Sequence, residues 1–137
     1  MSKVNQRIIV SALIKKDDKY LFIKQNKEGG AYPNTLHIPG GGLDTSEDLT
    51  EAVKREIKEE TNLEITNVQP FDFDSDILNY KGVPTQLIFL RFLADYQSGE
   101  AKPGDDAKEI IWLSADEIGK YNHNEPSIRL LKKLAII

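Results

Sequence analysis

Residues 39–63 read PGGGLDTSEDLTEAVKREIKEETNL, a glycine run followed by a segment with helical periodicity. Asp48 and Glu51 have the spacing of a capping box, in which the N-cap side chain accepts a backbone hydrogen bond and the third helical residue reaches back. Asn62 can close a helix because asparagine tolerates the left-handed backbone conformation. The sequence therefore predicts a helix over residues 49–61.

This predicted helix directs acidic side chains inward. At about 100° per residue, Glu56 and Glu60 fall within its apolar arc, Glu59 lies beside that arc, and Thr61 falls on the solvated side. An E-x-x-E-E motif alone is most often a solvated face, here with Arg55 and Glu59 as an i,i+4 pair. Three carboxylates this close, however, raise one another's pKa or require a cation, and magnesium prefers such oxygen ligands.

The spacing around the helix is more specific than the acidic motif. Five residues separate Gly41 from Glu47, seven separate Glu47 from Arg55, and the segment ends in Thr61-Asn62-Leu63. Over these 23 positions the segment closely resembles the Nudix box. It departs where the family usually has glycine and this chain has Asn62, a mild change since asparagine can end a helix in the same way.

The resemblance implies an α+β fold, a Nudix-type α/β/α sandwich with a mixed β-sheet. It also implies a metal-dependent hydrolase that cleaves the diphosphate linkage of a nucleoside diphosphate joined to another moiety, such as a nucleoside triphosphate, ADP-ribose or a nucleotide sugar. The implied cofactor is Mg²⁺, with Mn²⁺ as a substitute. Outside residues 39–63 the match is weak, although the order of elements agrees over most of the chain.

The same resemblance implies the metal ligands. Glu59 and Glu60 would be the main ligands, and Glu56 would be a third ligand or the general base that prepares water. The carbonyl of Gly40, just before the helix, would be a further ligand. Such a mechanism needs no covalent intermediate with the enzyme.

Other residues would brace or complete this site. Glu47 and Arg55 would form an ion pair that orients the ligands. Many relatives supply one more acidic group from the region of the Pro103-Gly104 loop, and here Asp105, Asp106 and Glu109 are the candidates. A solvated acidic loop is an equally good interpretation of these three, and Glu109 is the preferred ligand among them.

Elsewhere the pattern predicts a hairpin, further strands and two more helices. The hairpin joins residues 8–14 to residues 20–23, and short apolar runs predict the other strands. Ser114 and Glu117 form a second capping box, and Pro126 suits the first turn of a terminal helix. The predicted strands cover residues 35–38, 85–93 and 109–113, and the predicted helices cover residues 116–118 and 126–134.

The bulk composition limits the function classes. A chain of 137 residues with 39% hydrophobic content predicts one domain over residues 1–137. No apolar run could span a bilayer and no secretory segment is recognisable, so we expect a cytoplasmic protein. Without cysteine, a metal needs oxygen or histidine ligands. The net charge of -4 argues against general nucleic-acid binding, and a small anion would need local cations.

Several single residues have two interpretations. His37 is more readily a strand residue than a ligand, and Trp112 and Phe89 are more readily core residues than aromatic rings that stack on a base. Arg7 and Lys24 could meet a phosphate group, but exposed cations at strand ends are common.

Three alternative functions stay open at this stage. One is a catalytically inactive Nudix-fold module that binds or senses nucleotides, which the complete set of acidic residues disfavours. The others are an isomerase of diphosphate esters and a protein-interaction domain with a structural ion. The substrate and the oligomeric state are undetermined, although homodimers are common among such domains. The run of residues 104–109 faintly resembles relatives that act on ADP-ribose or nucleoside triphosphates.

Overall fold

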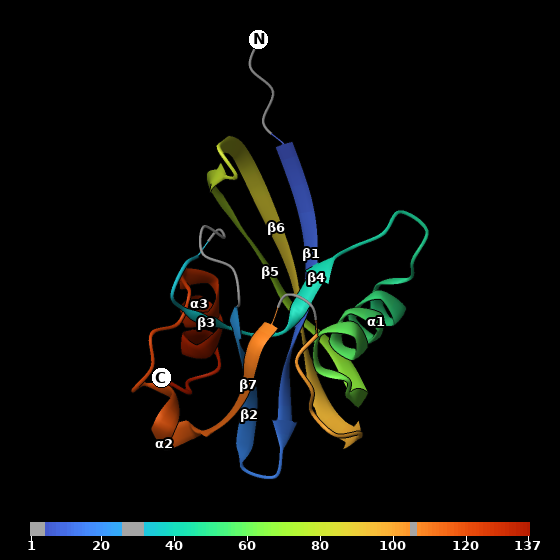
Figure 1. Cartoon of the computed structure of the whole chain (residues 1–137), viewed down its shortest axis with the longest axis vertical. Helices are drawn as coiled ribbons and strands as arrows, with labels where there is room; N and C mark the ends of the chain where they lie inside the picture. Colours follow the sequence, from blue (N-terminus) through green and yellow to red (C-terminus); the bar gives the residue numbers. More distant parts are fainter. Residues whose placement is uncertain (1–4, 26–31, 105–106) are drawn as a thin grey trace.

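The computed structural model describes residues 5–25, 32–104 and 107–137. These residues form one sheet with helices on both sides (Figure 1). In chain order the elements are β1 (Asn5–Lys16), β2 (Lys19–Gln25), β3 (Leu36–His37), β4 (Gly40–Gly42), α1 (Leu49–Thr61), β5 (Glu64–Tyr80), β6 (Val83–Ser98), β7 (Ala107–Ser114), α2 (Ala115–Ile118) and α3 (Glu125–Lys133).

The sheet is mixed, as the resemblance implies. Its strand order is β3-β2-β1-β6-β5, with β4 paired to β1 and β7 paired to β2. β1 and β6 run parallel, and the other pairs are antiparallel. One edge of β1 pairs first with β4, at residues 9–11, and then with β2, at residues 15–16. This change of partner brings the glycine run against the middle of β1.

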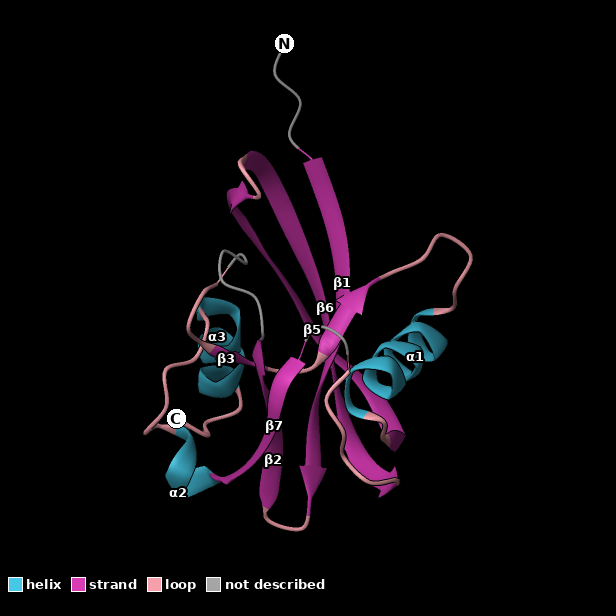
Figure 2. Ribbon diagram, viewed as in Figure 1, coloured by secondary structure: helices cyan, strands magenta, loops and turns pink. Residues whose placement is uncertain are grey.

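Alternate residues of β1 face two separate cores. Val10, Ala12 and Ile14 are buried in the core that α1 covers, whereas Leu13 lies in the core that α2 and α3 cover. Figure 2 shows α1 on one side of the sheet, with α2 and α3 on the other. The α/β/α layering is therefore confirmed. Among the described residues, no helix is long and apolar enough to cross a membrane.

Helix α1 has the predicted ends but a rotated buried face. The Asp48 side chain accepts hydrogen bonds from the backbone N–H groups of Thr50 and Glu51, and Asn62 ends the helix with a φ of 66°. The solvated position predicted for Thr61 is wrong: its side chain is fully buried. Burial is inexpensive there because the Thr61 hydroxyl donates to the Ile57 carbonyl at 2.6 Å. Leu49, in contrast, is 41% exposed.

Two strands lie where the sequence pattern predicts none. Residues 40–42 form the short strand β4, which pairs with β1. β5 is a 17-residue strand in which Ile65, near its start, is buried, but further along it Phe73 is 79% and Ile77 is 72% exposed. In this later stretch the side chains that face inward are those of Asp72, Asp74 and Asp76, the reverse of the usual pattern, which hid the strand.

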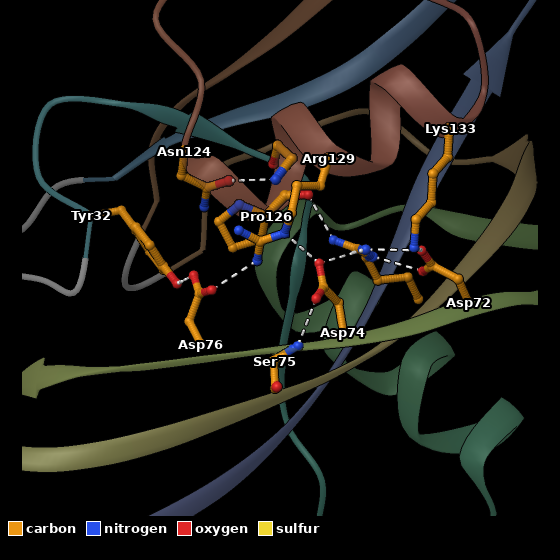
Figure 3. Close-up of polar contacts among 11 residues, drawn as sticks. Tyr32, Asp72, Asp74, Ser75, Asp76, Asn124, Pro126, Arg129 and Lys133 are labelled. Atoms are coloured by element: carbon orange, nitrogen blue, oxygen red, sulfur yellow. Dashed lines mark hydrogen bonds and ion pairs between the residues drawn. The ribbon is translucent and has the colours of Figure 1, made fainter.

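The inward acids of β5 lie in a group of six charged residues that we call the Arg91 cluster (Figure 3). It consists of Asp72, Asp74, Asp76, Arg91, Arg129 and Lys133. The side chain of Arg91 is only 1% exposed; it binds both oxygens of Asp72 at 2.7 and 2.8 Å and the Pro126 carbonyl at 2.6 Å. The cluster therefore joins β5 and β6 to α3.

Candidate active site

The glycine strand and α1 approach each other closely. The backbone N–H of Gly40 donates to Oε1 of Glu60 at 3.2 Å. A Cβ atom added at Gly41 would overlap the carboxylate of Glu56, and one added at Gly40 would overlap the Val10 carbonyl. Glycine at position 41 lets the acidic turn of α1 lie against β4, which Figure 1 shows beside that helix, and glycine at position 40 lets β4 lie against β1.

Arg55 connects the loop, the glycine strand and the helix. Its Nε and Nη2 donate to the two oxygens of Glu47 at 2.5 and 2.6 Å, which is the predicted bracing pair. Its Nη1 also donates to Glu56 at 2.8 Å and to Glu59 at 3.2 Å. Nη2 reaches the Gly42 carbonyl at 3.3 Å. The resemblance implied the first of these contacts, and the i,i+4 contact belongs to the alternative interpretation of the motif as a solvated face. Neither interpretation included the bridge between Glu56 and Glu59.

The charges around Arg55 do not balance. Asp44 lies 3.6 Å from this guanidinium, so one cation faces four carboxylates, those of Asp44, Glu47, Glu56 and Glu59, a net charge of 1 - 4 = -3. We call these five residues the Arg55 cluster. Burial raises the pKa of Glu56 above its ordinary value, although the hydrogen bond from Arg55 acts in the opposite direction. The hydrogen bond from Arg55 lowers the pKa of Glu47.

The residues here fit a hard divalent cation in charge and in donor type. The Glu59 side chain is 61% exposed and that of Glu56 is 16% exposed, so carboxylate oxygens line both the surface and the interior side of the turn. In the part of the chain that the structure describes, no three acidic or histidine side chains are already spaced to hold one ion. Arg55 now lies between Glu56 and Glu59. A cation at this turn would compete with that guanidinium for the two carboxylates.

The loop before β7 packs against the end of α1. Gly104 N–H donates to the Glu60 carbonyl at 2.8 Å, and a Cβ at Gly104 would overlap the Glu59 carbonyl. The predicted acids Asp105 and Asp106 follow directly but lie outside the described residues. Sequence reasoning did not predict this contact, since Gly104 and Glu60 are far apart in the chain.

Glu109 lies on β7, away from any described contact with the Arg55 cluster. It is paired in the sheet with Lys24 of β2, and the two charged groups are 3.9 Å apart. Its side chain is 54% exposed. The structure thus brings together Glu47, Arg55, Glu56 and Glu59, with Glu60 on Gly40, but shows no contact between them and Glu109.

The side chains of His37, Phe89 and Trp112 pack within the fold and make no described contact with the Arg55 cluster. Nδ1 of His37 donates to the Ile38 carbonyl, 2.9 Å away, and burial lowers the pKa of this imidazole. Phe89 is 7% exposed, and Trp112 packs against the core beneath α1. The prediction that both aromatic side chains belong to the core is confirmed.

Comparison with known proteins agrees with this geometry. A family model described as NUDIX domain matches residues 5–134. The nucleoside triphosphatase NudI of Escherichia coli K12 is 29% identical over 136 residues, which span 94% of this chain and 96% of that protein.

Solved structures show the same fold. The MutT Nudix hydrolase from Burkholderia pseudomallei superposes with a TM-score of 0.81 at 22% identity, over 93% of this chain and 97% of that one. A bifunctional NMN adenylyltransferase/ADP ribose pyrophosphatase from Francisella tularensis, complexed with AMP and a Mn ion, gives a TM-score of 0.75 at 21% identity. That match covers 98% of this chain and 42% of the other. The chain therefore belongs to the Nudix, or MutT-like, family and is a Nudix pyrophosphohydrolase.

Proposed function

We propose that this protein is a metal-dependent enzyme that hydrolyses a P–O–P linkage of a nucleoside triphosphate. The observation that carries the proposal is the contact between the glycine strand and the acidic turn of α1, in which Gly40 binds Glu60 and Gly41 leaves room for Glu56. The similarity to NudI over nearly the whole chain favours a triphosphate over the other substrates of the wider class.

In this proposal the carboxylates of Glu59 and Glu60 hold the metal, with the Gly40 carbonyl as a further ligand. Glu56 is a third ligand or the general base. When bound, Mg²⁺, or Mn²⁺ in its place, would supply positive charge that neutralises the phosphate oxygens and would lower the pKa of the attacking water. The excess charge of -3 around Arg55 is consistent with a site that is completed by a cation.

The other residues position this apparatus. Glu47 holds Arg55 through two hydrogen bonds, and Arg55 in turn fixes the Gly42 carbonyl. Water attacks phosphorus, a new P–O bond forms, and the bridging P–O bond breaks with its electron pair leaving on the departing phosphate. The water proton passes to the general base. In this proposal the groups of the chain hold the metal, position its ligands or accept a proton, and no covalent adduct forms.

The direct test is a panel of nucleoside triphosphates, ADP-ribose and nucleotide sugars with Mg²⁺ or Mn²⁺, with products identified by mass. We expect Glu60→Gln to fold and to lose about a hundred- to ten-thousand-fold in metal-dependent turnover. Glu51→Gln is a matched control, because Glu51 lies on the same helix, in its first turn and exposed. Near-wild-type hydrolysis by Glu60→Gln would remove Glu60 from the mechanism. Binding without turnover by the wild type would favour the inactive nucleotide sensor.

A further inference from the structure

Arg7 differs from the other arginines of the protein. The chain has four, and all lie in the part that the structure describes. Arg55, Arg91 and Arg129 bind carboxylates, whereas Arg7 has no acidic partner among the described residues. It lies on β1 opposite Leu87 of β6, in an exposed position. Its charge is therefore available to a ligand from solution.

An aromatic ring holds this guanidinium in place. Cζ of Arg7 lies 5.2 Å from the centre of the Tyr80 ring, and Nζ of Lys81 lies 5.3 Å from the same centre. Lys81 is at the turn between β5 and β6. Figure 1 shows this turn near the start of β1. Two like charges share one ring without a described acidic partner. An anion bound beside them would relieve their repulsion.

The glycine strand separates these cations from the Arg55 cluster. A Cβ atom added at Gly42 would lie 3.7 Å from Nη2 of Arg7. The Gly42 carbonyl accepts a hydrogen bond from Arg55 at 3.3 Å. Gly42 thus lies between two guanidinium groups: that of Arg7, which has no described carboxylate partner, and that of Arg55, which binds carboxylates. A molecule with several phosphates could extend from the acidic turn past Gly42 to Arg7.

We infer that Arg7 and Lys81, positioned by Tyr80, form a binding site for a phosphate group of the substrate. The planar guanidinium can donate two parallel hydrogen bonds to phosphate oxygens, and the ammonium adds charge. This inference rests on the proposed function for the identity of the ligand. It gives that function a basis for selectivity, since a triphosphate has a phosphate to offer Arg7 where ADP-ribose has only a neutral sugar beyond its diphosphate.

Binding can be measured without turnover. The probe is a nucleoside triphosphate in which methylene groups replace both bridging oxygens, α–β and β–γ, titrated calorimetrically into the intact protein with Mg²⁺. We expect Arg7→Ala to raise the Kd about ten- to a hundredfold, a loss typical of charge-assisted hydrogen bonds. Lys81→Ala should raise it by a smaller factor. Kd values within twofold of wild type for both variants, or no binding by the wild type, would overturn the inference.

The chain supplies a matched control at another aromatic pair. Nζ of Lys16 lies 4.2 Å from the Tyr96 ring centre, at the opposite end of β1. Lys16→Ala removes the same kind of contact and should leave the Kd unchanged. An equal loss of binding in Lys16→Ala and Lys81→Ala would show that net charge alone is responsible, which contradicts a local site.

Tyr80 acts through Arg7 and is a positioning residue. Tyr80→Phe keeps the ring and should retain wild-type affinity, whereas Tyr80→Leu should raise KM for the triphosphate and leave kcat nearly unchanged. Rescue by phenylalanine separates this role from a general loss of folding. If the wild type binds the analogue through Arg7 but hydrolyses no triphosphate, the proposed function fails and the phosphate site stands. If it hydrolyses triphosphates and the Arg7→Ala Kd and KM are unchanged, only this inference fails.

Discussion

The Arg55 and Arg91 clusters are both built around a guanidinium that binds several carboxylates, yet their charges differ. In the Arg91 cluster, three cations face three aspartates, and the net charge is 3 - 3 = 0. In the Arg55 cluster the net charge is -3. The Arg91 side chain is 1% exposed and that of Arg55 is 29% exposed. The central guanidinium of the balanced cluster is closed to solvent, whereas that of the unbalanced cluster is partly accessible.

The pKa directions agree with this contrast. Burial raises the pKa of Asp72, but the hydrogen bonds from Arg91 and Lys133 together lower it by more than burial raises it, so the pKa lies below its ordinary value. For Glu56 burial prevails and the pKa rises. Folding therefore favours the charged form of Asp72 in the Arg91 cluster and disfavours the charged form of Glu56 in the Arg55 cluster. We interpret the Arg91 cluster as a structural joint and the Arg55 cluster as a binding site.

The largest expected effect on stability is in the Arg91 cluster. Arg91→Leu leaves Asp72 and Asp74 without their buried cation and frees the Pro126 carbonyl, so we expect the free energy of unfolding to fall by about 3–5 kcal/mol. Urea denaturation monitored by circular dichroism measures this change.

The control for that variant lies in the same cluster. Lys133 is 49% exposed, and Lys133→Met should cost no more than about 1 kcal/mol because solvent screens an exposed ion pair. If Arg91→Leu is as stable as wild type, the structural role assigned to the Arg91 cluster is wrong.

The next effect is a response of the Arg55 cluster to metal. Mg²⁺ at a hundred times its Kd should raise the free energy of unfolding by about 2.7 kcal/mol, because it binds the folded state alone. A chelator should reverse the increase, and Glu60→Gln should abolish it. Asp76→Asn, in the Arg91 cluster, should respond to Mg²⁺ as the wild type does. Thermal melting with and without Mg²⁺ measures all four cases, and an unchanged melting temperature would contradict a metal site at α1.

The helix carrying the Arg55 cluster was predictable, and the Arg91 cluster was not. The signals that bound α1, Asp48 and Asn62, lie next to the helix in the chain. The salt bridge between Asp74 and Arg129, in contrast, joins residues 55 positions apart. A sequence pattern that assigns charged residues to solvent cannot show that a distant arginine neutralises an aspartate. For this reason the sequence pattern did not predict β5.

In the candidate site, too, contacts within a local motif were predictable and contacts between distant residues were not. The ion pair of Glu47 with Arg55 was predicted from a motif that covers both residues, and the contact of Gly104 with α1 was not. Thr61 was assigned to solvent because a helical wheel gives no information on which hydroxyl groups bond to their own helix. Roles assigned to the glutamates as metal ligands remain predictions, and the contact of Arg7 with Tyr80 depends on residues 73 positions apart.

A smaller effect is the dependence of the free energy of unfolding on pH in the acidic range. Since the pKa of Asp72 and that of Asp74 are lowered by folding, both groups stabilise the protein fully above their ordinary pKa of 3.8. This contribution is lost as the pH falls through the lowered values. We expect the free energy of unfolding to decline below about pH 4 in the wild type and to decline less steeply in Asp72→Asn. Urea denaturation at several pH values gives the slope, and equal slopes would contradict the assigned shift.

The smallest expected effect is at Asn62, where the family usually has glycine. Asn62→Gly relieves the strain of a left-handed residue but removes the hydrogen bond from Asn62 Nδ2 to the Glu100 carbonyl at 3.0 Å, so we expect a change within about 0.5 kcal/mol. Asn62→Ala keeps the strain and loses the bond, and should cost about 1–2 kcal/mol. Neither variant alters a carboxylate of the Arg55 cluster, so the Mg²⁺ response of the melting temperature should survive both. Loss of that response in Asn62→Gly would mean that the end of α1, rather than its acidic turn alone, sets the geometry of the metal site.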